Sequence, residues 1–277
     1  MALFTVFGSP IAHSLSPQIQ LEFADQFGLV NEYRRSLSSP GRFAADVAYF
    51  FRHGGSGANV TVPFKQQAYQ LVTHTTLRAR QAGAVNTLMG LGAGQVLGDN
   101  TDGLGLVADL RWQLAQAQAG DLRGKTVLLL GAGGAARGVV GPLLDAGVAS
   151  LTVANRTEAR AAELVQRFAD SRLAYCSMTA LPAADIIIQA TSVALQQQTL
   201  ALPENLAAQA LLCYDMSYGA SATEFLQWAA AHGCKNCHDG LGMLVEQAAL
   251  SFALWHDGLL PDSRAVIAKL LERNTNE

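Results

Sequence analysis

The sequence predicts an α/β protein of two domains, the second of which is a Rossmann-type, doubly wound domain. A short apolar run at residues 126–130 is followed at once by the glycine turn 131–136 and then by a helical pattern. From residue 125 to residue 214, apolar runs of strand length alternate with helical segments, which is the βαβ order of a parallel sheet. The residues before this turn carry strands and helices of their own. These observations place an α/β domain ahead of the Rossmann-type domain.

Composition excludes several classes of protein. The chain has 277 residues, 50% of them hydrophobic and 15% charged, so it can bury a large core and disorder is not expected. A net charge of −3 without a long Lys/Arg cluster argues against a nucleic-acid surface. No Lys or Arg precedes Arg34, and prolines interrupt the N-terminal stretch, so neither a secretory signal nor a membrane span is predicted. We expect a cytoplasmic protein.

Four cysteines, Cys176, Cys213, Cys234 and Cys237, raise the question of a disulfide, haem or metal site. Without export, structural disulfides are not expected. Residues 234–238 read C-x-x-C-H, which matches a haem-attachment pattern and also resembles a redox pair. We interpret this motif as incidental, because no export signal accompanies it and no further ligand cluster completes a zinc site. No metal is expected.

The chain begins with a predicted buried strand at residues 3–7 and a turn. A helix then starts with Ser16 as its N-cap and Pro17 at the first helical position, and Gly28 ends it. Ser14 and Ser16, ahead of this helix, offer hydroxyl groups beside free backbone N–H groups, an arrangement that suits a carboxylate. The alternative is that Ser16 only caps the helix.

Lys65 follows a strand in a position that invites two interpretations. Residues 32–37 read as a strand, Phe43 opens a helical pattern, and a further strand at 58–62 is stopped by proline. Lys65 therefore lies at the carboxyl end of a strand, where open α/β sheets place ligand-binding groups. A cation is disfavoured at a helix N-terminus. Lys65 is either a solvent-exposed residue without a functional role or a residue that takes part in the reaction.

The rest of the first domain ends at another polar turn. One helix is predicted to run to about Ala79, followed by a strand at 83–89 that turns in a glycine-rich segment and pairs back with residues 95–97. Residues 98–103 are polar and lead straight into an apolar helical pattern. Asp102 at the start of that helix can be a simple cap.

Residues 117–124 read as a linker to the second domain, and the chain ends in two helices. The predicted strands of the second domain are 127–130, 151–153, 173–176, 186–188 and 211–214, its helices are 135–146 and 158–168, and the last two helices cover 241–255 and 259–271.

The glycine turn has the spacing of a dinucleotide-binding loop. Gly131 allows the tight turn, Gly133 lets backbone N–H groups approach a pyrophosphate, and the small Ala136 allows close helix packing. The anion then lies at a helix N-terminus. The alternative is an ordinary glycine-rich turn.

The residues after the next strand favour NADP over NAD. An NAD site usually carries an acidic residue about 20 residues past the glycines, but the sequence here is Asn155-Arg156-Thr157 with Arg160 beyond. Guanidinium groups match a 2′-phosphate in charge and geometry. The alternative is that both arginines belong to a solvated helix face.

Several motifs, in order, make the sequence similar to shikimate dehydrogenases almost from end to end. These motifs lie at residues 14–17, 57–65, 82–87, 98–103, 131–137, 155–157 and 239–244. The resemblance implies a substrate-binding domain at 1–104, completed by C-terminal helices at 240–277 that return to it, and an NADP-binding domain at 105–239. It implies reversible NADPH-linked reduction of 3-dehydroshikimate to shikimate in aromatic amino-acid and chorismate biosynthesis. We expect a monomer or a homodimer.

The resemblance also assigns roles to residues. The implied catalytic pair is Lys65 and Asp102. The implied substrate-binding residues are Ser14, Ser16, Thr61, Asn86, Tyr218 and Gln247. The implied NADP-binding residues are Gly131, Ala132, Gly133, Gly134, Ala135, Asn155, Arg156, Thr157, Arg160, Thr191, Met216 and Gly240.

Three departures from the family pattern leave alternatives open. Gln189 replaces an Asn, Ala194 replaces a Gly, and Glu224 stands where the family often has Pro. A broader quinate/shikimate dehydrogenase is the nearest alternative, although Asn155 and Arg156 argue against its usual NAD. A non-catalytic dinucleotide sensor is the alternative from another class, and retention of the implied catalytic pair argues against it.

Overall fold

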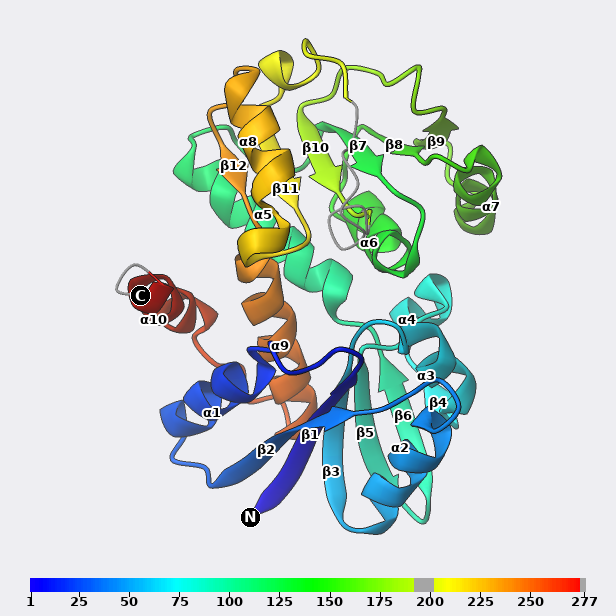
Figure 1. Ribbon diagram of the computed structural model, residues 1–277, viewed down its shortest axis with the longest axis vertical. Helices are drawn as coiled ribbons and strands as arrows, with labels where there is room; N and C mark the ends of the chain where they lie inside the picture. The colour runs from blue at the N-terminus through cyan, green and yellow to red at the C-terminus, as the bar shows by residue number, and fades with distance from the viewer. Residues whose placement is uncertain (192–201, 275–277) are drawn as a thin grey trace. The chain divides into compact units, whose positions relative to one another are not determined.

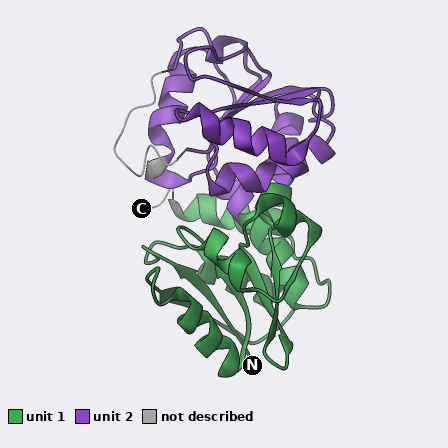
Figure 2. Ribbon diagram, turned by 90° about the vertical axis from the view of Figure 1, so that its right-hand side faces the viewer, with its two compact units in different colours: residues 1–105, 245–277 green, residues 106–244 purple. Residues whose placement is uncertain are grey.

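The computed structural model describes residues 1–191 and 202–274, and the chain forms two compact units (Figure 2). The first unit comprises Met1–Gly105 and Val245–Glu277, and the second comprises Leu106–Leu244. Two helices, α5 (Asp102–Gln116) and α9 (Leu241–Trp255), carry the chain from one unit to the other. The first unit is therefore built from both ends of the sequence.

The first unit contains a mixed six-stranded sheet in the order β2-β1-β3-β5-β6-β4 (Figure 1). Its strands are β1 (Ala2–Gly8), β2 (Asn31–Leu37), β3 (Gly55–Val60), β4 (His74–Thr75), β5 (Thr87–Gly92) and β6 (Gln95–Asp99). Strand β1 pairs in parallel with β2 and β3, whereas β5 is antiparallel to β3 and β6. The predicted hairpin between β5 and β6 is present.

Helices cover both faces of this sheet because β1 is apolar on both. Successive side chains of a strand point to opposite faces. Phe7 packs with Phe43 and other residues of α2, while Phe4 stacks on Trp255 of α9 at 4.8 Å between ring centroids. The other helices of this unit are α1 (Ser16–Gln26), α2 (Phe43–Arg52), α3 (Lys65–Leu71), α4 (Leu77–Ala82) and α10 (Ser263–Asn274).

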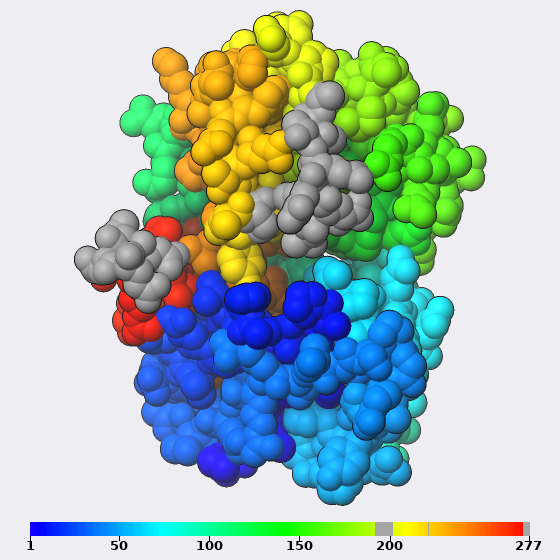
Figure 3. Space-filling model, viewed as in Figure 1, coloured from blue at the N-terminus to red at the C-terminus, as the bar shows by residue number. Residues whose placement is uncertain are grey.

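The C-terminal helix α10 lies beside α1, so distant parts of the sequence meet in one unit. Lys269 Nζ is 2.7 Å from Glu22 Oε2 across this contact. In the space-filling view of Figure 3, red α10 lies against the blue N-terminal segment. The return of the C-terminal helices to the first unit, expected from the family resemblance, is present in the fold.

The second unit contains an all-parallel six-stranded sheet in the order β12-β11-β10-β7-β8-β9. Its elements are β7 (Thr126–Leu130), α6 (Gly134–Asp145), β8 (Ser150–Ala154), α7 (Glu158–Phe168), β9 (Leu173–Cys176), β10 (Ile186–Gln189), β11 (Leu212–Asp215), α8 (Thr223–Ala231) and β12 (Cys237–His238). The central strands are buried apolar runs, as expected for strands with both faces covered. The predicted Rossmann-type fold class is confirmed.

Three local predictions in the first unit are wrong. The single helix predicted to residue 79 is instead α3, the short strand β4 and α4. A threonine-rich stretch breaks it, because β-branched residues disfavour helix and the Thr76 side chain accepts a hydrogen bond from Ala79 N to start α4. Leu15, not Ser16, is the N-cap of α1, and it makes no side-chain cap. The strand predicted from residue 83 starts at Thr87, because Gly83 adopts a left-handed conformation that ends α4.

Among the residues that the structure describes, no helix is both long and apolar enough to cross a bilayer.

Candidate functional site

The predicted substrate residues of the first unit gather at one edge of its sheet. Strands β1 and β3 run parallel and end there, β5 begins there because it is antiparallel to β3, and β6 ends there. Ser14 follows β1, Lys65 follows β3, Asn86 precedes β5 and Asp102 follows β6. The fold therefore brings to one edge side chains that lie far apart in the sequence.

Lys65 and Asp102 form an ion pair at this edge. Lys65 Nζ lies 2.7 Å from Asp102 Oδ2, and the two side chains are 20% and 6% exposed. Lys65 is the first residue of α3 and Asp102 is the first residue of α5. The helix dipole stabilises a carboxylate at the start of α5 and disfavours a cation at the start of α3, so Asp102 compensates the position of Lys65.

Asn86 connects this ion pair to helix α9. Its Nδ2 lies 2.8 Å from Asp102 Oδ1 and 3.0 Å from Gln247 Oε1, while its Oδ1 accepts from Thr101 N at 2.9 Å. All four of these residues are buried. Buried polar groups that satisfy one another in this way hold a fixed arrangement. The arrangement leaves the Lys65 ammonium as the more exposed member of the cluster.

A turn at residues 14–16, here called the serine turn, precedes α1. Ser14 Oγ donates to Ser16 Oγ at 3.2 Å and accepts from Ser16 N at 3.3 Å, so the two hydroxyl groups face each other. The N-cap residue of α1, Leu15, makes no side-chain hydrogen bond to the first turn of the helix. Hydroxyl donors beside an uncapped helix N-terminus form a site suited to an anion.

Thr61 lies at the same edge, between β3 and α3. Its backbone N donates to Phe7 O at 2.9 Å, which holds it beside the end of β1. Gly8 lies against it, because a Cβ at Gly8 would be 2.6 Å from the methyl group of Thr61. The structure thus places Thr61 beside β1, four residues before Lys65 in the chain.

In the second unit, the glycine turn joins β7 to α6. Gly131 has φ +113°, and a Cβ there would meet backbone atoms of Ala190 at 3.0 Å, so only glycine fits. A Cβ at Gly133 or Gly134 would meet nothing within 4 Å. Helix α6 starts at Gly134 without a side-chain cap. Gly133 and Gly134 therefore border open space at a helix N-terminus, whereas Gly131 and Ala132 of the predicted cofactor set are buried.

The predicted NADP-selective residues follow β8. Asn155 Nδ2 donates to Thr157 O at 2.8 Å, and Thr157 is the N-cap of α7. Arg160 N donates to Thr157 O at 3.0 Å, and the side chains of Arg156 and Arg160 are both exposed. Two guanidinium groups thus lie on one exposed helix start of the same unit as the glycine turn.

The loop after β11 contains two further predicted residues, Met216 and Tyr218. A third predicted residue, Gly240, packs against this loop. A Cβ at Gly240 would lie 2.4 Å from Met216 O, and Gly240 N donates to Ser217 O at 2.7 Å. Tyr218 follows in this loop, which Asp239 ties down by accepting from Gly219 N at 2.9 Å. Met216 and Gly240 are therefore in contact, and Tyr218 lies beside them in the second unit.

Three protein-family models match the chain in consecutive stretches. A shikimate dehydrogenase substrate binding domain matches residues 6–88, a shikimate / quinate 5-dehydrogenase model matches 113–217, and a shikimate 5'-dehydrogenase C-terminal domain matches 240–271. The chain belongs to the shikimate dehydrogenase family. The membership predicted from the sequence motifs is confirmed.

Several solved structures resemble the chain over nearly its whole length. An Ael1 enzyme from Pseudomonas putida is 40% identical, with 98% of each chain covered and a TM-score of 0.89. Shikimate 5-dehydrogenase from Thermus thermophilus, in complex with NADP(H) and shikimate, is 33% identical, with 97% and 98% covered and a TM-score of 0.84. A 5-ketofructose reductase of Gluconobacter is 29% identical, with 98% of each chain covered and a TM-score of 0.83.

Sequence reasoning missed the polar residues that lie behind the candidate site. Asn59 Nδ2 donates to Ser251 Oγ at 3.1 Å, Ser251 bonds Thr87 at 2.7 Å, and Tyr33 donates to Asn59 Oδ1 at 2.7 Å. Burial raises the pKa of Tyr33 well above its usual range, so its hydroxyl stays a proton donor. The available signal was the polar residue Ser251 in the otherwise apolar second half of α9, together with Asn59 near the end of β3.

The cysteines of the second unit lie in apolar surroundings. All four are free, and Cys213 and Cys234 are buried in the apolar cluster beneath α8. Burial raises the pKa of Cys237 to about 12, which keeps this thiol protonated at neutral pH. In residues 1–191 and 202–274, no three or more His, Cys, Asp and Glu side chains group in a way that could hold a metal ion.

The departures from the family pattern have different outcomes. Gln189 Oε1 accepts from Thr191 N at 3.0 Å, so this glutamine orders the backbone after β10 and holds the predicted cofactor residue Thr191. Ala194 lies outside the described residues. Glu224 lies in the first turn of α8, where the helix dipole favours a carboxylate.

Proposed function

We propose that this protein is a shikimate dehydrogenase that catalyses the NADP-dependent, reversible reduction of 3-dehydroshikimate to shikimate. The observation that carries the proposal is the ion pair of Lys65 and Asp102, held by Asn86 at the sheet edge that also bears the serine turn. Family membership supports it, as does the Thermus relative solved with NADP(H) and shikimate. Broader quinate/shikimate dehydrogenase activity is the alternative, and assays with paired substrates distinguish the two.

The second unit has the features that an NADP site needs. The open space at Gly133 and Gly134, next to an uncapped helix N-terminus, fits a pyrophosphate. The exposed guanidinium groups of Arg156 and Arg160 suit the 2′-phosphate. Residues 131–135 together with Asn155, Arg156, Thr157 and Arg160 would hold the nucleotide. Thr191, Met216 and Gly240 complete the proposed set of NADP-binding residues. When bound, NADPH supplies the hydride for the carbonyl carbon.

The first unit has the features that the acid substrate needs. The facing hydroxyl groups of Ser14 and Ser16 donate to its carboxylate, and the uncapped start of α1 favours that charge. Asn86, Gln247 and Thr61 orient the ring hydroxyl groups. Tyr218, in the loop after β11, is a further proposed substrate-binding residue. The first unit is accordingly the substrate domain and the second the NADP domain.

Lys65 manages the proton of the reduction. Reduction of a ketone places negative charge on its oxygen, and a neighbouring ammonium both stabilises that charge and delivers a proton to it. Lys65 Nζ gives its proton to the ketone oxygen and becomes a neutral amine, and a proton from solvent then restores the ammonium. In the reverse reaction, Nζ takes the proton from the substrate hydroxyl group. Asp102 accepts a hydrogen bond from Lys65 Nζ and so fixes the direction of the remaining N–H donors. Asn86 fixes the carboxylate in turn.

Steady-state assays with paired substrates test the proposal. Purified enzyme is supplied with NADP or NAD together with shikimate or quinate, and with NADPH together with 5-ketofructose, the substrate of the Gluconobacter relative. We expect the highest kcat/KM for NADP with shikimate. A preference for quinate favours the broader dehydrogenase, a preference for 5-ketofructose contradicts the role of the serine turn, and no turnover with any pair favours a sensor.

Two further expectations accompany this function. We propose that the enzyme works in the cytoplasm, where its nicotinamide cofactor is available. We propose that it works as a monomer or a homodimer, which sedimentation velocity distinguishes.

A further inference from the structure

Arg35, on strand β2, donates two hydrogen bonds to the serine turn. Its Nε and Nη2 both donate to the carbonyl oxygen of Ser14, at 2.9 and 2.7 Å. The opposite end of the same residue is tied as well, because Ser14 N donates to Ile11 O at 3.1 Å. A residue bonded at both its N–H and its C=O has a fixed backbone, so the direction of its Cα–Cβ bond, from which the hydroxyl group extends, is set.

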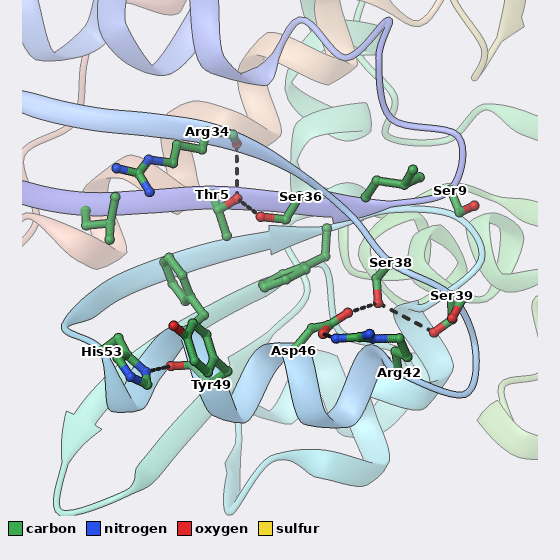
Figure 4. Close-up of a pocket in the computed structure, with 14 residues that line it drawn as sticks. Thr5, Ser9, Arg34, Ser36, Ser38, Ser39, Arg42, Asp46, Tyr49 and His53 are labelled. Atoms are coloured by element: carbon green, nitrogen blue, oxygen red, sulfur yellow. Dashed lines mark hydrogen bonds and ion pairs between the residues drawn. The ribbon is translucent and has the colours of Figure 1, made fainter.

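The neighbouring Arg34 points the other way. Successive side chains of β2 alternate between the two faces of the sheet. Thr5 Oγ1 bonds Ser36 and the Arg34 backbone on the face toward α2, where Arg34 also lines a pocket of the first unit (Figure 4). The Arg34 side chain pairs with Glu32, whereas Arg35 reaches the serine turn. The two adjacent arginines therefore provide a test residue and a matched control.

We propose that Arg35 is a positioning residue of the substrate site. It holds the serine turn in the shape that receives the substrate carboxylate, and it adds a positive charge beside that carboxylate. The inference rests on the proposed function, because it assigns the serine turn to an anionic substrate group.

Two physical effects support this role. The fork of guanidinium N–H groups fixes the plane of the Ser14 peptide more firmly than one donor does. A charged donor on a carbonyl also polarises the peptide and strengthens hydrogen bonds further along the chain. Tyr33, two residues earlier on the same face of β2, is buried beside Ser16 and donates to Asn59. Strand β2 thus braces both serines from one side.

The charge of Arg35 has a signature that a purely structural brace lacks. The Arg35 side chain is exposed, so its attraction for an anion is screened as ionic strength rises. A brace made of hydrogen bonds alone responds little to salt. The salt dependence of substrate affinity, compared between variants, therefore separates the two contributions.

The test compares Arg35→Gln, Arg35→Lys and the control Arg34→Gln. For Arg35→Gln we expect KM for shikimate to rise at least about tenfold, since a hydrogen-bonding charged group is lost, with kcat within about twofold. Arg35→Lys keeps the charge and loses the planar fork of two donor nitrogens, so we expect it to recover part of the affinity. Arg34→Gln stays near wild type. Thermal unfolding of each variant shows whether the fold is intact.

Binding probes separate this inference from the proposed function. Calorimetry measures the affinity of each variant for shikimate and for methyl shikimate, which lacks the negative charge, at low and high salt. We expect Arg35→Gln to weaken shikimate much more than the ester and to flatten its salt dependence. If wild-type enzyme binds and turns over shikimate while Arg35→Gln behaves as Arg34→Gln does, the inference is overturned and the proposed function stands. If wild-type enzyme does not use shikimate, the proposed function itself fails.

Discussion

Replacement of Lys65 by Met removes the ammonium group and keeps most of the side-chain stem. In the wild type, Lys65 Nζ lies 2.7 Å from Asp102 Oδ2. The variant has no proton to give to the ketone oxygen and no charge to stabilise it. We expect kcat to fall by roughly 10²–10⁴, which is about 3–5.5 kcal/mol of transition-state stabilisation.

The same substitution has a smaller effect on stability. Removing one partner of a fully buried ion pair costs about 3–5 kcal/mol because a buried charge is left alone. Asp102 is 6% exposed, but Asn86 Nδ2 still donates to its Oδ1 and the dipole of α5 still favours it. We therefore expect a loss of about 1–2 kcal/mol, below that range. Lys65 itself is 20% exposed, which also lowers the loss.

Three measurements decide the outcome. Single-turnover kinetics report the chemical step, urea unfolding reports stability, and fluorescence titration reports NADP affinity, which should be unchanged because the proposed NADP residues belong to the other unit. Lys269→Met serves as the control. Lys269 is 57% exposed, and its partner Glu22 belongs to neither the proposed substrate residues nor the proposed NADP residues. A near-normal single-turnover rate in Lys65→Met would refute the assignment of Lys65 as proton donor.

Other substitutions test other parts of the structure. Replacing Arg156 and Arg160 together by Ala should weaken NADP far more than NAD, and titration with both nucleotides checks this; an equal loss for both contradicts the 2′-phosphate assignment. Gly105→Ala places a Cβ 2.6 Å from the backbone N of Gln247, so it should lower stability by roughly 1–3 kcal/mol and raise KM for shikimate as Gln247 shifts; normal thermal unfolding contradicts this packing. Burial raises the pKa of Asp215 from its ordinary 3.8 to about 6. Because this folded-state pKa lies above the unfolded one, wild-type stability falls as pH rises through about 6. Asp215→Asn removes that loss and should gain roughly 1 kcal/mol relative to wild type between pH 5 and pH 8; urea unfolding at both pH values measures it, and a pH-independent difference contradicts the shift.

The sequence predicted the second unit better than the first for a physical reason. Its strands are parallel and buried on both faces, so each is an apolar run that stands out from its surroundings, as at β7 and β10. Helix α8 was not predicted, because its weakly amphipathic pattern follows a loop without clear start signals. In the first unit, the apolar pattern around α3 continues past the threonines that end it. The periodicity of apolar residues does not show that the Thr76 hydroxyl accepts a hydrogen bond from Ala79 N and so starts α4.

The candidate site divides in a similar way. Lys65 and Asp102 lie in motifs, so the sequence could name them, and the structure places them together; their roles stay predictions. Arg35 could not be named, because its bond to Ser14 joins residues 21 positions apart and depends on which face of β2 it occupies. The contact of Asn86 with Gln247 spans 161 positions. Such contacts depend on tertiary packing and leave no local periodicity.

The return of α9 to the first unit has a consequence for the order in which the protein can be completed during synthesis. Until residues 245–255 have left the ribosome, the face of β1 that carries Phe4 lacks the indole of Trp255 that stacks on it. Asn59 and Thr87 lack the hydroxyl of Ser251, and Asn86 lacks Gln247. The second unit, in contrast, is encoded in one continuous stretch. The N-terminal segment, although made first, therefore acquires its full core and its full set of polar contacts only after the second unit has been synthesised.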